Sequence, residues 1–123
     1  LAQQLAGAGD ATSVIMRTAV EKGSDCRICS LTVETFVSIL AAEAGNMVLR
    51  HMATGGLYLG GGIPPRILPL LREPDFERWF VRKGRLSHLT EKAPVHVIMH
   101  PKAALVGSAS LGLQLANEQA EER

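Results

Sequence analysis

The sequence predicts a helix-rich α/β fold with a small parallel sheet, and three observations support this prediction. Two short runs of large apolar and β-branched residues predict strands: 57–59, which we expect to be buried on both faces, and 94–99. The segment between them is long enough to contain helices, and such connections favour parallel strands joined by a right-handed crossover. The 123 residues, 46% of them hydrophobic and 20% charged, have the size and composition of one globular domain. Two strands form an unusually small sheet, so we expect part of a larger architecture.

Charge, cysteine content and hydropathy exclude several classes of protein. Thirteen Lys and Arg residues against twelve Asp and Glu residues give a net charge of +1, which favours neither nucleic acid nor an anionic membrane surface as a partner. Two cysteines cannot build a disulfide scaffold. The apolar stretches are interrupted by Gly, Pro, Thr or charged residues before the roughly 18 residues of a membrane helix. We therefore expect a cytoplasmic protein with no nucleic-acid partner and no membrane partner.

The start of the chain predicts a segment of a longer protein. The first residue is Leu1, and the residues that follow have neither the basic region nor the apolar core of a signal peptide. We expect residues 1–9 to be a linker or the remnant of a preceding segment. Residues 10–117 are expected to fold, and residues 118–123 to form a frayed tail.

Capping residues and apolar spacing predict two helices in the first half of the chain. The first begins at Asp10 or Thr12 and ends near Lys22 and Gly23. The second covers about 26–52. Its apolar residues recur at spacings of three and four, which indicates one buried helical face: Leu31, Val33, Phe36, Val37, Leu40, Ala44, Met47 and Val48.

The second helix has two further features. Ser24 or Asp25 can cap its first turn. Gly45 lies near its middle, where glycine costs about 1 kcal/mol relative to alanine. A packing reason usually accounts for such a glycine. We therefore expect close approach of another backbone, with the helix lying directly against the sheet.

The second half of the chain predicts shorter helices. Pro64 or Pro65 at a first helical position predicts a helix over 66–71. Residues 73–92 are polar, and we expect them to be irregular apart from a short amphipathic turn around their aromatic residues. A last helix is predicted over 102–117.

Gly60, Gly61 and Gly62 are the best candidates for a binding site. They follow the first expected strand and precede a helix. Residues without a Cβ let a ligand touch the backbone, and a helix start offers N–H groups. Ligands of open α/β sheets bind at the carboxyl ends of the strands. A tight turn that needs glycine only for its backbone dihedral angles explains the same pattern equally well. The spacing matches neither a P-loop nor a dinucleotide-binding fingerprint.

Cys26 and Cys29 form a C-x-x-C motif at the start of the long helix, where the helix dipole can make a thiol reactive. No strand of a thioredoxin-like unit precedes the motif, and no second C-x-x-C completes a zinc site. His96 and His100 are about 70 residues away in the sequence. Two reduced structural cysteines are therefore the favoured interpretation, with redox or metal chemistry as the alternative.

No residue pattern identifies a catalytic group. The sequence has no evident Ser/His/Asp set, no glycosidase-like pair of carboxylates and no evident general base. Acidic residues dilute the Lys and Arg residues between 78 and 92, which is typical of a solvated loop.

Two stretches resemble the C-terminal part of the bacterial glucokinases, a family of the hexokinase/actin-like ATPase superfamily. These are GGLYLGGGIPPRILPLL, residues 55–71, and FERWFVRKGRLSHLTEKAPVHVIMHPKAALVGSASLG, residues 76–112. The expected long helix is similar to the helix that precedes this part in those enzymes. The resemblance implies that residues 10–117 are part of the C-terminal lobe of the ribonuclease-H-like actin/hexokinase ATPase fold.

The resemblance also implies an activity and a site. Members of the family transfer the γ-phosphoryl group of ATP, with Mg²⁺, to the 6-hydroxyl group of glucose between two lobes. Their adenosine-binding motif is a strand that ends in glycines at the head of a helix. In this sequence the motif implies that Gly60, Gly61 and Gly62 lie beside the nucleoside and that Ile63 and Pro64 wall the adenine.

The other catalytic and binding residues of the family have no match in this sequence. The catalytic aspartate, the sugar-binding residues and the phosphate-binding loops of the family lie upstream of anything in this sequence. The resemblance thus implies a segment with no catalytic residue and no metal ligand, inactive as a kinase by itself. Exposed sheet edges and apolar helix faces predict self-association, and homodimers are common in the family. The alternative is an interaction or regulatory module derived from the same fold, which binds no nucleotide.

Overall fold

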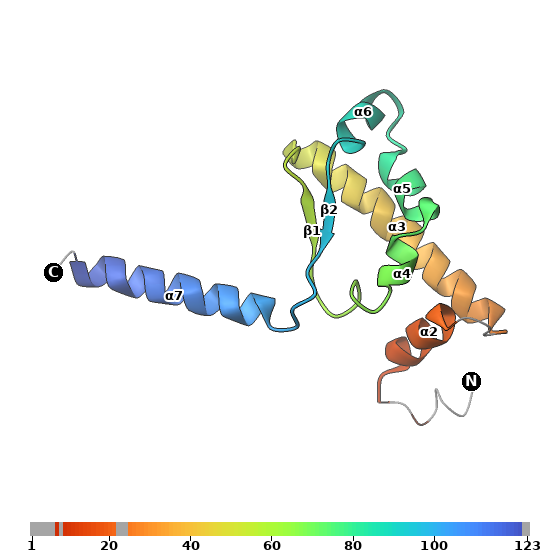
Figure 1. The fold of residues 1–123 in the computed structure, drawn as a ribbon, viewed down its shortest axis with the longest axis horizontal. Helices are drawn as coiled ribbons and strands as arrows, with labels where there is room; N and C mark the ends of the chain where they lie inside the picture. The colour runs from red at the N-terminus through yellow and green to blue at the C-terminus, as the bar shows by residue number, and fades with distance from the viewer. Residues whose placement is uncertain (1–6, 8, 22–24, 122–123) are drawn as a thin grey trace.

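The computed structural model confirms a helix-rich α/β fold (Figure 1). It describes residues 7, 9–21 and 25–121, so most of the expected linker over 1–9 lies outside the described residues. In chain order the elements are α2 (Ala11–Val20), α3 (Arg27–His51), β1 (Leu57–Leu59), α4 (Leu68–Leu71), α5 (Pro74–Val81), the 3₁₀ turn η1 (Gly84–Leu86), α6 (Ser87–Thr90), β2 (Val95–Val97) and α7 (Ala103–Glu121).

The two strands pair in parallel, as the long connection between them predicts. Leu57 lies opposite Val95, and the N–H of Leu57 donates to the carbonyl of Pro94 at 2.8 Å. The expectation that the first strand is buried on both faces is wrong. Tyr58 is 66% exposed, and its ring stacks on that of His96 with centroids 4.9 Å apart. The sheet therefore has one face toward the core and one open face.

The core forms where α3 packs on α5 and α2, and the inner face of the sheet joins it through Leu59. Gly45 of α3 permits this packing, because a Cβ at this position would collide with the carbonyl oxygen of Phe80 in α5. Close approach of a backbone at Gly45 is thus confirmed, but the neighbour at this position is helix α5 and not the expected sheet. The buried residues of α3 form one stripe along the helix: Cys29, Val33, Val37, Ala41, Ala44, Gly45 and Val48.

Lys83 fixes the loop after α5 onto α3, beside this close contact. Its ammonium group donates to the carbonyl of Ala42 at 2.6 Å and to Oδ1 of Asn46 at 2.7 Å. Partial burial lowers the pKa of Lys83, and the nearby carboxylate of Glu43 acts in the opposite direction. The two hydrogen bonds hold the loop beside Gly45 of α3.

The ends of the first two helices differ from their predictions. Asp10 caps α2, and its carboxylate accepts from the N–H of Thr12 at 3.1 Å. The helix ends at Val20, and the predicted stop at 22–23 lies outside the described residues. Cys26 caps α3 in place of Ser24 or Asp25, because its sulfur accepts from a backbone N–H of the first turn.

Residues 73–92 are more regular than predicted, since they contain α5, η1 and α6. The apolar side of α5 provides the reason: Phe76 and Phe80 are buried, with ring centroids 6.1 Å apart. The helix predicted over 66–71 begins only at Leu68, so neither expected proline occupies its first position. A separate turn precedes it, in which the N–H groups of Arg66 and Ile67 both donate to the carbonyl of Ile63.

Helix α7 extends away from the other elements (Figure 1). From residue 104 to residue 120 every side chain of the helix is exposed, including five large apolar ones. These lie on more than one side of the helix, a pattern that is typical of a helix with neighbours around it. Residues 118–121, which we expected to form a frayed tail, continue this helix.

By length and composition alone, α3 is apolar enough to cross a membrane, contrary to the expectation that every apolar stretch is too short. The packing of α2 and α5 on its buried stripe accounts for this apolar character. Glu34, Glu43 and Arg50 occupy its exposed side. These features are those of the central helix of a folded core.

Replacement of Gly45 by alanine tests the packing of α3 on α5. We expect a lower urea midpoint of unfolding, because overpacking against a backbone atom costs about 1–3 kcal/mol. This cost exceeds the helix-propensity gain of up to about 1 kcal/mol from alanine. Gly55→Ala is the matched control, since a Cβ there meets nothing within 4 Å. An unchanged or higher midpoint for Gly45→Ala, with the control unaltered, contradicts the packing.

Candidate functional site

A hollow of about 610 Å³ lies where both parallel strands end. The chain leaves β1 through Gly60, and it leaves β2 through Ile98. The N–H of Ile98 donates to the carbonyl of Leu59 at 2.9 Å, which holds the two exits side by side. This edge of the sheet is where open α/β folds bind ligands. Eleven residues line the hollow: Gly60, Gly61, Gly62, Pro65, Arg66, Ile98, Met99, His100, Pro101, Ala103 and Ala104.

The three glycines differ in what the fold requires of them. Gly61 has φ +102°, a conformation that other residues rarely adopt. Gly60 and Gly62 lie outside the left-handed region. A Cβ on Gly60 would meet only the Ile98 side chain at 3.4 Å, and one on Gly62 would meet nothing within 4 Å. The backbone conformation therefore accounts for Gly61, and neither conformation nor packing accounts for Gly60 and Gly62.

The backbone of this turn offers hydrogen-bond donors. Among the described residues, no group accepts from the N–H groups of Gly60, Gly61 or Gly62. Pro65 has no N–H, and that of Arg66 is already bonded within the following turn. Successive exposed N–H groups next to a positive φ can bind an oxygen-rich ligand. The glycine turn thus has both the space and the donors for such a contact.

Charge in the hollow is positive. The Arg66 guanidinium lies 3.5 Å from the Asp10 carboxylate, and both side chains are about half exposed. An exposed pair of this kind contributes about 0–1 kcal/mol, so the guanidinium remains available to a ligand. His100 accepts through Nδ1 from the N–H of Lys102 at 3.2 Å. The lining contains no Asp or Glu.

Ile63 and Pro64 lie apart from the three glycines. Pro64 is buried, and Ile63 packs against the hydrophobic core, so neither lines the hollow. Pro65 and Arg66 occupy the lining in their place. A direct contact of Ile63 or Pro64 with a nucleoside stays a prediction.

The second exit, which begins at Ile98, was not predicted as part of the site. Six residues of the lining between 98 and 104 follow β2 or begin α7. Their sequence carries no glycine pattern. The parallel pairing of the two strands is the signal that finds them, since it places both carboxyl ends at one edge.

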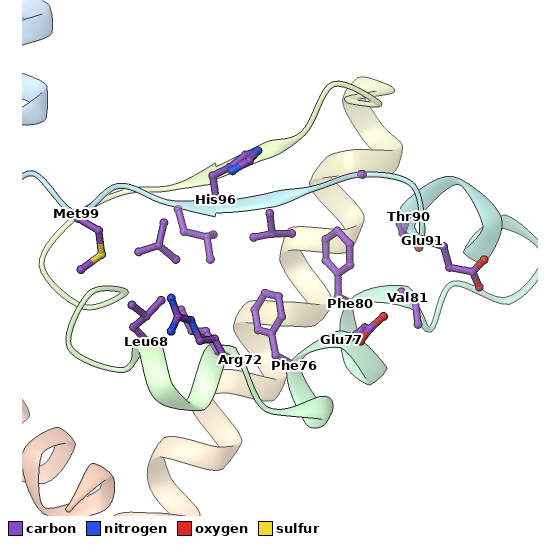
Figure 2. Close-up of a pocket in the computed structure, with 15 residues that line it drawn as sticks. Leu68, Arg72, Phe76, Glu77, Phe80, Val81, Thr90, Glu91, His96 and Met99 are labelled. Carbon is purple, nitrogen blue, oxygen red and sulfur yellow. The ribbon is translucent and has the colours of Figure 1, made fainter.

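A second hollow, of about 440 Å³, lies between β2 and the helices α4 and α5 (Figure 2). Phe76 and Phe80 rise from α5 toward the strand, and Arg72 lies near Leu68 at one end. The hollow shares Met99 with the first one but includes no residue of the glycine turn. Its lining combines the apolar side chains with the charged or polar side chains of Arg72, Glu77, Glu91 and His96.

The described residues contain no group of three or more His, Cys, Asp or Glu side chains that could hold a metal ion. The histidines at 96 and 100 do not approach the cysteines at 26 and 29 in any such group.

Sequence comparison places the chain beside bacterial glucokinases. The family model for glucokinase matches residues 2–115. The glucokinase of Caulobacter sp. (strain K31) is 47% identical over 87 residues, which cover 71% of this chain and 26% of that protein. The glucokinase of Trichormus variabilis is 39% identical over 117 residues, covering 92% of this chain and 34% of that protein. That of Nostoc punctiforme is 39% identical over 106 residues, or 86% and 30%.

The extent of these matches bears on what the chain contains. The chain spans about a quarter to a third of the length of the curated relatives it matches. No solved structure matches it. The family match nevertheless covers nearly the whole chain, including both strands, the glycine turn and most of α7. The chain therefore belongs to the glucokinase family.

Proposed function

We propose that the chain is the C-terminal segment of a glucokinase and that the hollow beside the glycine turn holds the adenosine part of ATP. The observation that carries this proposal is the pair Gly60 and Gly62, which neither backbone conformation nor packing explains. A nucleoside lying against bare backbone explains both glycines. The intact enzyme would transfer the γ-phosphoryl group of ATP to the 6-hydroxyl group of glucose in the cytoplasm.

The chemistry of the hollow suits this role. Exposed N–H groups of the glycine turn can donate to ribose hydroxyls or phosphate oxygens. Arg66 adds a permanent positive charge beside them. Ile98 and Met99 provide apolar surface for a base on the opposite side. Ile63 and Pro64 lie on the core side of the turn. We propose that they act on the adenine by supporting the turn that contacts it.

The remaining parts of the reaction fall outside this chain in the proposal. Phosphoryl transfer needs a group that accepts the proton of the sugar hydroxyl, and Mg²⁺ to neutralise the phosphates. The lining has no carboxylate for either task. We therefore assign the base, the sugar site and the ligands of Mg²⁺ to the rest of the enzyme. The two strands and α3 would then be part of the C-terminal lobe of the actin-like ATPase fold.

Nucleotide binding to the glycine turn is testable by NMR titration of the chain with ATP. We expect shifts of the amide signals of Gly60–Gly62 and of 98–104, and about tenfold weaker binding by Gly62→Val, which places methyl groups in the proposed contact. Gly55→Val, at the opposite end of β1, is the control and should bind as well as the wild type. Equal binding by both variants rejects the site, and no binding by the wild type rejects it and favours the interaction module.

The chain alone should not phosphorylate glucose. This follows because a lining without a carboxylate supplies no base for the sugar hydroxyl. The measurement is a coupled assay for glucose 6-phosphate at high protein concentration, with a full-length bacterial glucokinase as the positive control. A rate above the no-protein background that disappears in Gly62→Val would show that the chain contains its own catalytic groups.

We propose further that the chain associates with a second copy through its exposed apolar surface. Helix α7 carries Leu105, Leu111 and Leu113 in the open, each more than half exposed. Surface of this kind on one long helix favours association. The free edges of the two-stranded sheet add unpaired backbone groups.

Light scattering at increasing concentration tests this association. We expect the apparent mass of the wild type to rise above that of a monomer, and Leu113→Glu to weaken association by about tenfold, since it places a charge in the apolar contact. Ile39→Glu on α3, equally exposed but away from α7, is the control. A monomer at every concentration contradicts the proposal.

A further inference from the structure

The two cysteines meet at the first turn of α3. Cys26 is the N-cap residue of this 25-residue helix, and its sulfur accepts from the N–H of Cys29 at 3.4 Å. The two sulfur atoms lie 2.7 Å apart in a hydrogen bond between the thiols. A disulfide bond has a length of about 2.05 Å. The sulfur atoms are therefore less than about one ångström from bonding distance.

The two thiols have different surroundings. Cys29 is 2% exposed and is the first residue of the buried stripe of α3. Cys26 is partly exposed and lies just outside the helix. Hydrogen bonds from the thiol and the backbone N–H of Cys29 lower the pKa of Cys26. The same hydrogen bond between the sulfur atoms and the burial of Cys29 raise the pKa of Cys29. One thiol is partly exposed and has a lowered pKa, and the other is buried and has a raised pKa.

We propose that Cys26 and Cys29 form a redox-active dithiol whose substrate is a low-molecular-weight disulfide. The accessible sulfur of Cys26 is the attacking group and the buried sulfur of Cys29 is the resolving group. A metal site at this position is not favoured, because the described residues provide no third ligand beside the pair. The proposal is independent of the nucleotide site, because no residue of α3 lines that hollow.

The reaction is thiol–disulfide exchange in two steps. The Cys26 thiolate attacks one sulfur of the substrate disulfide, forming a mixed disulfide and releasing the first thiolate of the substrate. Cys29 then loses its proton and attacks the Cys26 sulfur, which forms the internal disulfide and releases the second thiolate. Two electrons pass from the cysteine pair to the substrate, and the two protons of the cysteines end on the two released thiols.

Helix geometry allows this closure at small structural cost. Cys26 is the cap, with φ −81° and ψ 80°, so movement of its sulfur gives up the capping hydrogen bond from the N–H of Cys29 but leaves the backbone hydrogen bonds of the helix intact. The new bond would join two residues of one turn and tie α3 to no other element. Oxidation should therefore change the chemistry of the pair while the packing of α3 on α5 stays intact.

The test is incubation of the reduced chain in buffers of glutathione and glutathione disulfide, followed by acid quench, alkylation and mass mapping. We expect loss of both thiols together, with the internal Cys26–Cys29 disulfide as the main product and less than about a tenth of the protein as mixed disulfide. Cys29→Ser should accumulate the mixed disulfide on Cys26. Cys26→Ser should leave Cys29 unmodified, because that thiol is buried.

A measurement on the wild type alone keeps the test independent of how the variants fold. Limited alkylation of the reduced chain should modify Cys26 at least about tenfold faster than Cys29, since thiolate character and access control the rate. Three results overturn the proposal: a mixed disulfide on Cys26 that never closes, equal alkylation rates, or two thiols that remain reduced in a buffer of glutathione disulfide alone.

Discussion

Parallel pairing of β1 with β2 is the constraint on which the candidate site depends. Each strand has only three residues, yet the register that sets Leu57 opposite Val95 also sets both carboxyl ends at the same edge. The glycine turn leaves the sheet there, and so does the segment that leads into α7. An antiparallel pair would separate these two exits by the length of the strands. The long connection between the strands permits parallel pairing, and the parallel pairing places both strand ends beside the hollow.

So small a sheet cannot stabilise itself, and the helices carry that role. Leu59 joins the buried cluster that α3 and α5 build, so the strands are anchored through their inner face. The close approach at Gly45 brings the Phe80 backbone against α3, and Lys83 holds the following loop in place. That loop leads through α6 to β2. The position of the second strand therefore depends on a helix–helix contact that lies outside the sheet.

Local patterns in the sequence predict where the helices and strands lie better than they predict which elements pack against one another. The glycine turn, the long helix and both strands follow from spacing and composition, and the parallel direction follows from the length of the connection. Gly45 signals close packing but carries no information on whether a strand or a helix is the neighbour. Helix α5 is anticipated only as a short amphipathic turn, because its many charged residues dilute the signal of Phe76 and Phe80. The cap at Cys26 is missed because serine and aspartate, the usual capping residues, stand directly before it.

The geometry of the glycine turn distinguishes between two explanations of its glycines, backbone conformation and ligand contact, which the sequence alone leaves equal. A turn that needs glycine for its dihedral angles requires it only where φ is positive, and this holds at Gly61. At Gly62 the backbone is ordinary and the space beside it is empty, so the fold would accept a side chain. A glycine that neither the backbone conformation nor the packing of the chain requires indicates a contact with a group from outside the chain. Helix α7 leads to a similar conclusion, because a helix that is apolar on several sides and exposed along its length is stable only when something covers it. Under the proposed function, other parts of a larger enzyme contact these residues, and this explains both features. The matched segments make up only about a quarter to a third of the relatives' length.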